Sequence, residues 1–191
     1  MIRESRKNGV TLANHFTFMK NYKEDLRRIK AFIFDVDGVL SNSRIYLYPD
    51  GDLMRSMNIK DGYALQYAVR KDYVIGIITG GNSGSIKKRF HHLGIEDIYL
   101  KSKDKLIDFE HFIGKHKLDP VEVLYMGDDL PDYRVMQKVG FAACPSDAVE
   151  EIKSISKYIS DKGGGDGCVR DVVEQVLRLQ GNWMHDEAFH W

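Results

Sequence analysis

Acidic, hydroxyl and basic residues recur in this chain in four short groups whose side chains could do chemistry together. The groups are, in chain order, Asp35 with Asp37, Thr79 with Gly80, Lys105, and Asp128 with Asp129 and Asp132. Several carboxylates at one point repel one another, and a bound divalent cation removes that conflict. Oxygen ligands without histidine or cysteine favour Mg²⁺, which retains waters and a substrate phosphate around it. A cation, a lysine and a hydroxyl beside glycine can together neutralise a phosphoryl group.

Asp35 and Asp37 stand on either side of one residue, directly after a short apolar run. In an extended segment this spacing lets both carboxylates address the same rim of the fold. One of them can then attack phosphorus while the other transfers protons. The pair therefore predicts phosphoryl transfer through a covalent intermediate.

Strands and helices alternate along the chain, and they must position these groups. Strands are expected at 31–36, 73–78, 98–100, 121–126, 141–144 and 157–159. Helices are expected at 61–71, 82–93, 103–116, 131–139 and 169–179, with a flexible glycine-rich loop at 163–167. A hairpin of 45–48 and 53–59, closed by a Pro-Asp-Gly-Asp turn, interrupts the alternation.

This order predicts an α/β fold, a Rossmann-like doubly wound parallel sheet with helices on both faces and a small β-hairpin insertion. Ligands bind such sheets beyond the carboxyl ends of the strands. Asp35, Thr79 and Asp128 each follow a predicted strand, so they are expected to converge on one edge. Lys105 is preferred to Lys101 and Lys103 because it opens an amphipathic stretch facing that edge.

Composition limits the class of protein. The 28 basic and 28 acidic residues balance, so neither nucleic acid nor a membrane is expected as a partner. No apolar run is long enough to span a bilayer. Cys144 and Cys168 form no Cys-x-x-Cys pair and fit a reducing cytoplasm. We expect a flexible lead-in at 1–25, one domain at 26–180 and a tail at 181–191.

Other uses of these residues fit less well. A calcium loop beginning at Asp35 would need an acid or asparagine at Val39 and glutamate at Tyr46. The glycines at 80, 81 and 84 belong to neither a Gly-Lys-Ser/Thr nor a Gly-x-Gly-x-x-Gly pattern, so a nucleotide-binding loop is not expected. Asp128 with Asp129 could alone be a helix cap, and a cap at Thr79 is compatible with phosphate binding.

The four groups, in this order and at these predicted strand ends, resemble the motifs of the haloacid dehalogenase superfamily of phosphotransferases. The resemblance covers residues 30–180. It implies that Asp35 forms an aspartyl phosphate and that Asp37 protonates the leaving oxygen and then activates water. It also implies that phosphate is held by Thr79, Gly80 and Lys105. Mg²⁺ would be held by Asp35, the backbone carbonyl of Asp37 and Asp128. Asp129 and Asp132 would support these residues.

The segments between these motifs are filled by the hairpin, the helices and a short strand, so no cap domain is expected. The chain is most similar to a capless branch, through residues 58–63, 163–170 and 176–181. That similarity implies a phosphatase of 3-deoxy-D-manno-octulosonate 8-phosphate, a lipopolysaccharide precursor, with Lys60 among the substrate-binding residues. It also implies a homo-tetramer with hairpins at its centre and tails near neighbouring sites.

Gly81 and Asp166 depart from the branch, many members of which carry arginine at these positions. Both departures remove cations that could meet a sugar carboxylate, and Lys60, Lys87 or Arg170 are candidates to compensate. A nine-carbon sugar acid 9-phosphate is therefore an alternative substrate. A non-catalytic oligomerisation module of the same fold is another alternative, against which the retained acids and Lys105 argue.

Overall fold

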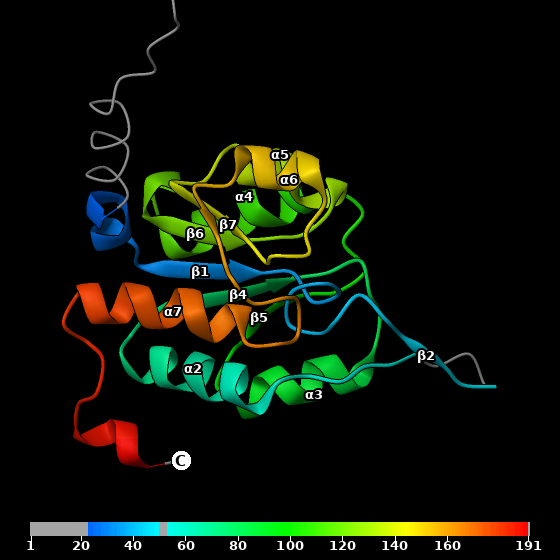
Figure 1. Cartoon of the computed structure of the whole chain (residues 1–191), viewed down its shortest axis with the longest axis horizontal. Coiled ribbons are helices and arrows are strands. Elements are labelled where there is room, and N and C mark those ends of the chain that lie inside the picture. Colours follow the sequence, from blue (N-terminus) through cyan, green and yellow to red (C-terminus); the bar gives the residue numbers. More distant parts are fainter. Residues whose placement is uncertain (1–22, 50–52, 191) are drawn as a thin grey trace, which may run out of the picture.

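A six-stranded sheet runs through the middle of the computed structural model, which describes residues 23–49 and 53–190 (Figure 1). In spatial order its strands are β5 (Asp97–Tyr99), β4 (Val74–Ile78), β1 (Ala31–Phe34), β6 (Val123–Met126), β7 (Phe141–Cys144) and β8 (Tyr158–Ile159). Every neighbouring pair is parallel. The predicted Rossmann-like sheet is confirmed, and the described residues contain no cap domain.

Helices cover both faces of this sheet (Figure 1). One face carries α2 (Ile59–Arg70), α3 (Gly84–His92) and α7 (Cys168–Leu179), and the other carries α4 (Lys105–His116), α5 (Tyr133–Met136) and α6 (Glu150–Ile155). Strand β1 explains the two layers, because successive side chains of a strand point to opposite faces. Phe32 and Phe34 belong to the first apolar core, whereas Ala31 and Ile33 belong to the second.

Polar side chains cap two helices and so determine the residue at which each helix begins. Asn58 precedes α2 and accepts a hydrogen bond from the N–H of Lys60 at 2.8 Å. Asp104 caps α4 in the same way, so Lys105 is the first residue of that helix. Asp61, the expected cap, lies instead within the first turn of α2. Its buried carboxylate accepts the N–H of Arg170 at the start of α7, at 2.7 Å.

Two predicted elements have other bounds in the structure, and one short helix was not predicted. The helix expected at 131–139 is divided into a 3₁₀ turn, η2 (Leu130–Asp132), and α5. Strand β6 begins only at Val123, because Pro120 starts a 3₁₀ turn, η1 (Pro120–Glu122), and cannot donate to a ladder. Helix α6 was not predicted, since so short a segment with one buried residue, Ile152, has little periodicity.

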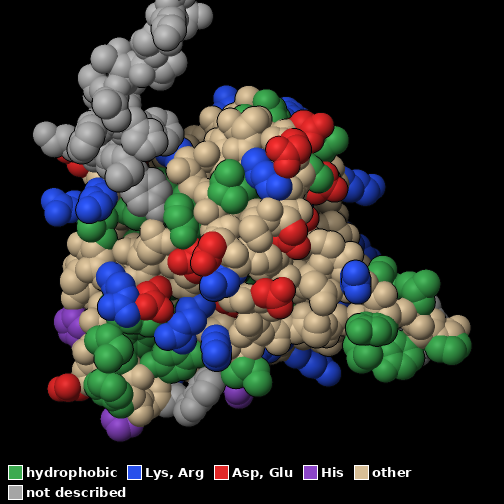
Figure 2. Space-filling view, viewed as in Figure 1, with side chains coloured by type: hydrophobic (Ala, Val, Ile, Leu, Met, Phe, Trp, Pro, Cys, Tyr) green, Lys and Arg blue, Asp and Glu red, His purple; other side chains and the backbone are tan. Residues whose placement is uncertain are grey.

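The hairpin is shorter than predicted and projects from the domain (Figure 1). It pairs β2 (Tyr46–Leu47) with β3 (Leu53–Met54). Figure 2 shows hydrophobic side chains gathered on this projection. The exposed residues are Ile45, Tyr46, Leu47, Tyr48 and Met54. A two-stranded hairpin cannot bury such a set by itself.

The glycine-rich segment 163–167, predicted as a flexible loop, lies against the backbone that follows β1. Gly165 donates its N–H to the carbonyl of Val39 at 2.9 Å. A Cβ atom on Gly164 would lie 2.1 Å from the carbonyl oxygen of Gly38. The two backbones approach this closely only because Gly164 has no side chain. The segment therefore braces the loop that carries Asp37.

Residues 181–190 pack on their own chain. The Trp183 ring meets Tyr67 edge to face, with centroids 5.3 Å apart. The Arg70 guanidinium donates to the carbonyl of His190 at 2.9 Å. The tail thus follows α2 within one chain, and the contact with a neighbouring site that the resemblance implied stays a prediction.

The lead-in predicted at 1–25 lies outside the described residues except at its end. Residues 23–28 are helical, and Leu26 is buried in the first core. The flexibility of the lead-in stays a prediction. Within the described part of the chain, no helix combines the length and apolar character needed to cross a membrane.

The close approach of Gly164 to Gly38 predicts a selective stability effect. We expect Gly164→Ala to lower the free energy of unfolding by about 1–3 kcal/mol, because the added methyl has no room. Gly84→Ala is the matched control, since a Cβ there meets nothing within 4 Å. Denaturant unfolding of both variants measures the difference. Equal stability of the two variants would contradict the packing described.

Candidate active site

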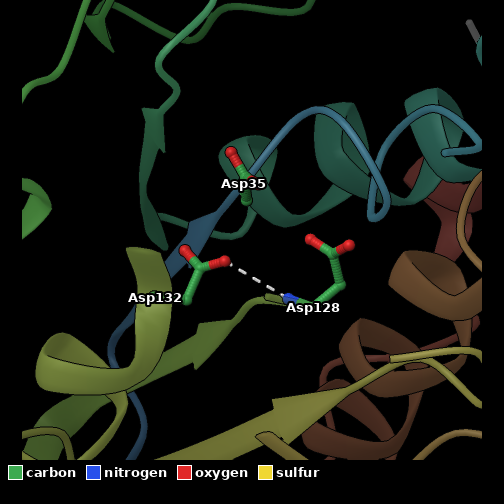
Figure 3. A group of neighbouring side chains, drawn as sticks. All are labelled: Asp35, Asp128 and Asp132. Atoms are coloured by element: carbon green, nitrogen blue, oxygen red, sulfur yellow. Dashed lines mark hydrogen bonds between the residues drawn. The ribbon is translucent and has the colours of Figure 1, made fainter. Parts of the chain in front are cut away.

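Three acidic side chains from different segments meet at the carboxyl edge of the sheet (Figure 3). Asp35 directly follows β1, Asp128 comes after β6, and Asp132 ends η2. One carboxylate oxygen of each lies within 4.8 Å of the others. The parallel, adjacent strands β1 and β6 bring the first two acids together.

Lys105 lies between two of these acids. Its Nζ is 2.9 Å from Asp35 Oδ1 and 2.7 Å from Asp132 Oδ1, and its side chain is only 7% exposed. The Asp104 cap places Lys105 in the first turn of α4, from which it reaches the cluster. Of the three lysines considered from the sequence, Lys105 is the one that contacts the acids.

Asp132 accepts hydrogen bonds at both carboxylate oxygens. Oδ1 accepts from Lys105 Nζ and, at 2.5 Å, from the Tyr125 hydroxyl, and Oδ2 accepts the N–H of Asp128 at 3.3 Å. These donors orient Asp132 so that it supports Asp128 and Lys105. Tyr125 was missed in the sequence, where a tyrosine in a buried aliphatic strand was the available signal.

Burial and mutual repulsion dominate the electrostatics of the cluster. Burial, and then the charge of Asp132, raise the pKa of Asp35 to about 7 despite the opposing effect of Lys105. Burial, and then Asp35 and Asp132, raise the pKa of Asp128 to about 8. Burial alone would lower the pKa of Lys105, but Asp35 and Asp132 raise it overall. The carboxylates need more positive charge than Lys105 supplies.

The residues present fit a divalent cation. Asp128 Oδ1 is buried and accepts no hydrogen bond within the described structure. Its carboxylate occupies the space beside Gly38, where a Cβ atom would lie 2.0 Å from Asp128 Oδ2. A buried oxygen without a donor, next to the carboxylate of Asp35, matches the oxygen-only ligand set that Mg²⁺ prefers.

Asp37 is held by an arginine that was not singled out in the sequence. Arg55, just after β3, donates from Nε to Asp37 Oδ1 at 2.5 Å and from Nη2 to Oδ2 at 2.9 Å. The Ser41 hydroxyl also donates to Oδ1, at 3.1 Å. The carboxylate of Asp37 is thereby directed to Arg55, and its side chain is not among the three that form the acidic cluster.

A cavity of about 620 Å³ opens over these residues. Thr79, which is 1% exposed, lies in its wall and accepts the N–H of Gly81 at its hydroxyl oxygen, at 3.0 Å. Gly80 and Gly81 line the cavity beside it. The remaining lining residues include the catalytic candidates and the base of the hairpin: Asp35, Asp37, Asn42, Ser43, Ile45, Leu53, Arg55, Ser102, Lys103, Lys105, Asp128, Asp129, Pro131 and Asp132.

Lys60 does not lie in this cavity. It is exposed in the first turn of α2, because Asn58 caps that helix, and it lines a separate cavity of about 270 Å³ with Arg170 and Phe189. The structure thus places Lys60 apart from the acids, and its contact with substrate stays a prediction. Asp129 lines the main cavity, but its carboxylate caps η2 by accepting the N–H of Leu130 at 2.8 Å.

Known proteins resemble this chain over most of its length, although no family model matches it. The 3-deoxy-D-manno-octulosonate 8-phosphate phosphatase of Escherichia coli K12 is 38% identical over 160 residues, which are 84% of each chain. The corresponding phosphatase of Yersinia pestis is 34% identical over 152 residues, which are 80% of this chain and 81% of the relative.

Solved structures share the fold. The 3-deoxy-D-manno-octulosonate 8-phosphate phosphatase of Moraxella catarrhalis, solved with magnesium, phosphate and KDO, superposes with a TM-score of 0.83 at 33% identity, covering 86% of this chain and 95% of that one. A haloacid dehalogenase superfamily hydrolase of subfamily III A from Legionella pneumophila superposes with a TM-score of 0.85 at 30% identity. The match covers 88% of this chain and 93% of that one. This chain belongs to the 3-deoxy-D-manno-octulosonate 8-phosphate phosphatase family of the haloacid dehalogenase superfamily.

Proposed function

We propose that this chain is a Mg²⁺-dependent phosphoric monoester hydrolase that releases phosphate from 3-deoxy-D-manno-octulosonate 8-phosphate. The observation that carries the proposal is the contact of Lys105 with Asp35, beside the donor-free oxygen of Asp128. Relatives that cover most of the chain carry this activity in their names, and one was solved with magnesium, phosphate and the product sugar acid.

Each site residue has a role that follows from its position. Asp35, the backbone carbonyl of Asp37 and Asp128 would hold Mg²⁺. When bound, the ion neutralises charge on the phosphoryl group and aligns it with Asp35. Lys105 and Thr79, with the backbone at Gly80, hold the phosphate oxygens.

The supporting residues are a second set. Asp132 orients Lys105 and the backbone of Asp128 through the hydrogen bonds described above. Asp129 caps the turn that carries Asp132 and so keeps that acid in place. This assigns to both residues the supporting part that the resemblance implied.

The reaction proceeds in two half-steps. A carboxylate oxygen of Asp35 attacks phosphorus while the bond from phosphorus to the sugar oxygen breaks, and Asp37 gives its proton to that oxygen. Asp37 then takes a proton from water as the water oxygen attacks phosphorus. The bond from phosphorus to Asp35 breaks, which releases inorganic phosphate. Asp35 is then again a carboxylate, and Asp37 is again a protonated acid.

The assembly and location of the protein are also proposed. The exposed apolar residues of the hairpin form a surface that a monomer would leave in water (Figure 2). A homo-tetramer centred on the hairpins would cover them. The cytoplasm is the proposed location, supported by Cys144 and Cys168, which are free, buried thiols.

The central prediction concerns substrate and nucleophile. The purified protein with Mg²⁺ should release phosphate from 3-deoxy-D-manno-octulosonate 8-phosphate faster than from a nine-carbon sugar acid 9-phosphate, measured as kcat/KM. Asp35→Asn should lower kcat by at least about 10⁴-fold, because an amide cannot attack phosphorus. Robust turnover by Asp35→Asn would refute the mechanism. Preference for the nine-carbon substrate would overturn the substrate assignment alone.

Raised pKa values predict how Mg²⁺ stabilises the protein. Without metal, folded Asp35 and Asp128 keep protons up to about pH 7 and about pH 8, whereas unfolded aspartate loses them near pH 4. Their contribution to stability therefore falls as pH rises from 4 through 8. Mg²⁺ competes with those protons, so it should raise Tm more at pH 8 than at pH 5.5. Thermal melts with EDTA or Mg²⁺ measure this, and Asp128→Asn should abolish most of the difference.

The hairpin predicts the oligomeric state. Light scattering of the intact chain should give the mass of four copies, and Leu47→Lys should give a smaller species, because a charge would be buried at the interface. Ile107→Lys is the control, since Ile107 is a similarly exposed apolar residue on α4, away from the hairpin. A monomeric wild type, or a Leu47→Lys protein of unchanged mass, would show the assembly proposal to be wrong.

A further inference from the structure

Arg55 is the basic side chain that the structure places against Asp37. Its side chain is 6% exposed, and the two hydrogen bonds from Nε and Nη2 reach both oxygens of one carboxylate. This is the paired geometry of a guanidinium with a carboxylate, which sets the plane of the acid as well as its position. A lysine could not impose the same orientation, since its ammonium is a point charge.

The hairpin holds Arg55 in this position. Arg55 directly follows β3, and its Nη1 donates to the carbonyl of Leu53 at 3.1 Å. The carboxylate of Asp37 is therefore oriented by a segment that follows it by 18 residues. Its orientation depends on the hairpin as well as on the loop after β1.

Gly81 leaves the space in which this contact forms. A Cβ atom at Gly81 would lie 3.3 Å from Arg55 Nη2, 3.3 Å from Thr79 Oγ1 and 3.6 Å from Asp37 Oδ2. A large side chain at position 81 would thus start between Arg55, Thr79 and Asp37. The absence of one there lets a guanidinium enter from the hairpin.

We propose that Arg55 is a positioning residue for Asp37. It fixes the plane of the carboxyl group, while the second lone pair of an oxygen that faces away from Arg55 carries the proton given to the leaving sugar oxygen. The inference rests on the proposed function, because it needs Asp37 to act as the acid of the first half-step. Arg55 itself forms and breaks no bond. Its contribution is the orientation of Asp37, delivered through the space that Gly81 leaves open.

Leaving groups of different basicity separate this role from a general structural one. The alkoxide of a sugar is strongly basic and needs a proton as its bond to phosphorus breaks. The 4-nitrophenolate ion is weakly basic and can leave without one. Because kcat/KM covers only the steps through the first irreversible bond cleavage, it reports proton donation to the leaving group and excludes hydrolysis of the aspartyl phosphate.

The experiment compares Arg55→Ala with wild type on 3-deoxy-D-manno-octulosonate 8-phosphate and on 4-nitrophenyl phosphate, both with saturating Mg²⁺. We expect kcat/KM for the sugar phosphate to fall by about 100-fold, within the range of general acid catalysis, and for the aryl phosphate by less than about threefold. Arg55→Lys keeps the charge and the aliphatic stem, so it provides the test should the alanine variant not fold. In this variant kcat/KM should fall by about tenfold for the sugar phosphate and stay nearly unchanged for the aryl phosphate.

Two controls complete the design. Arg44→Ala removes an exposed arginine from the base of the same hairpin and should leave kcat/KM unchanged for both substrates. Adding Arg55→Ala to Asp37→Asn should lower kcat/KM for the sugar phosphate by less than about threefold, because the residue that Arg55 orients is already inactive. Equal losses on both substrates, or additive losses in the double variant, would overturn the role of Arg55. A wild type inactive on both substrates would instead refute the proposed function.

Discussion

Lys105 stands between Asp35 and Asp132, 2.9 Å and 2.7 Å from their oxygens, at a place where burial disfavours every charge. Without this ammonium, Asp35 and Asp132 would lose the positive charge that lies between them. The rest of the site is arranged around that contact. The cap at Asp104 starts α4 where Lys105 can reach inward, and Tyr125 donates from β6 to the same oxygen of Asp132. One lysine still leaves an excess of negative charge, which is the physical reason for a divalent cation.

Close approach of backbone segments is a second constraint, and it explains why glycines gather around the site. Gly164 lies against the carbonyl of Gly38, and Gly38 in turn faces the carboxylate of Asp128. Each contact would be sterically impossible with a side chain at the glycine. The segment before α7 thereby stabilises the loop after β1, although it follows that loop by more than a hundred residues in the chain. Phosphoryl transfer requires reacting groups held to within fractions of an ångström, and such bracing supplies the rigidity.

Asp35, the proposed nucleophile, and Asp37, the proposed acid, are held in two different ways. Asp35 directly follows β1, and its N–H donates to the carbonyl of Met126 in β6 at 3.1 Å. Asp37 depends on Arg55, which comes from a small projecting hairpin with exposed apolar side chains. A hairpin of this size has little stability alone. Covering it in an assembly would therefore also stabilise the arginine that orients Asp37, so the proposed oligomer and the proposed proton transfer depend on the same structural element.

The sequence alone determined the order of the strands and of the longer helices, the parallel sheet and the residues at its edge, because hydrophobic periodicity and strand-end position are local properties of the chain. It also singled out Lys105 among three lysines. It did not reveal the short helix α6. Only the tertiary structure decided which polar groups touch. Arg55 meets Asp37 across the hairpin, and Lys60 lines a separate cavity although it stands between Asp37 and Thr79 in the sequence. Such contacts depend on how segments cross in space, and neither composition nor periodicity carries that information.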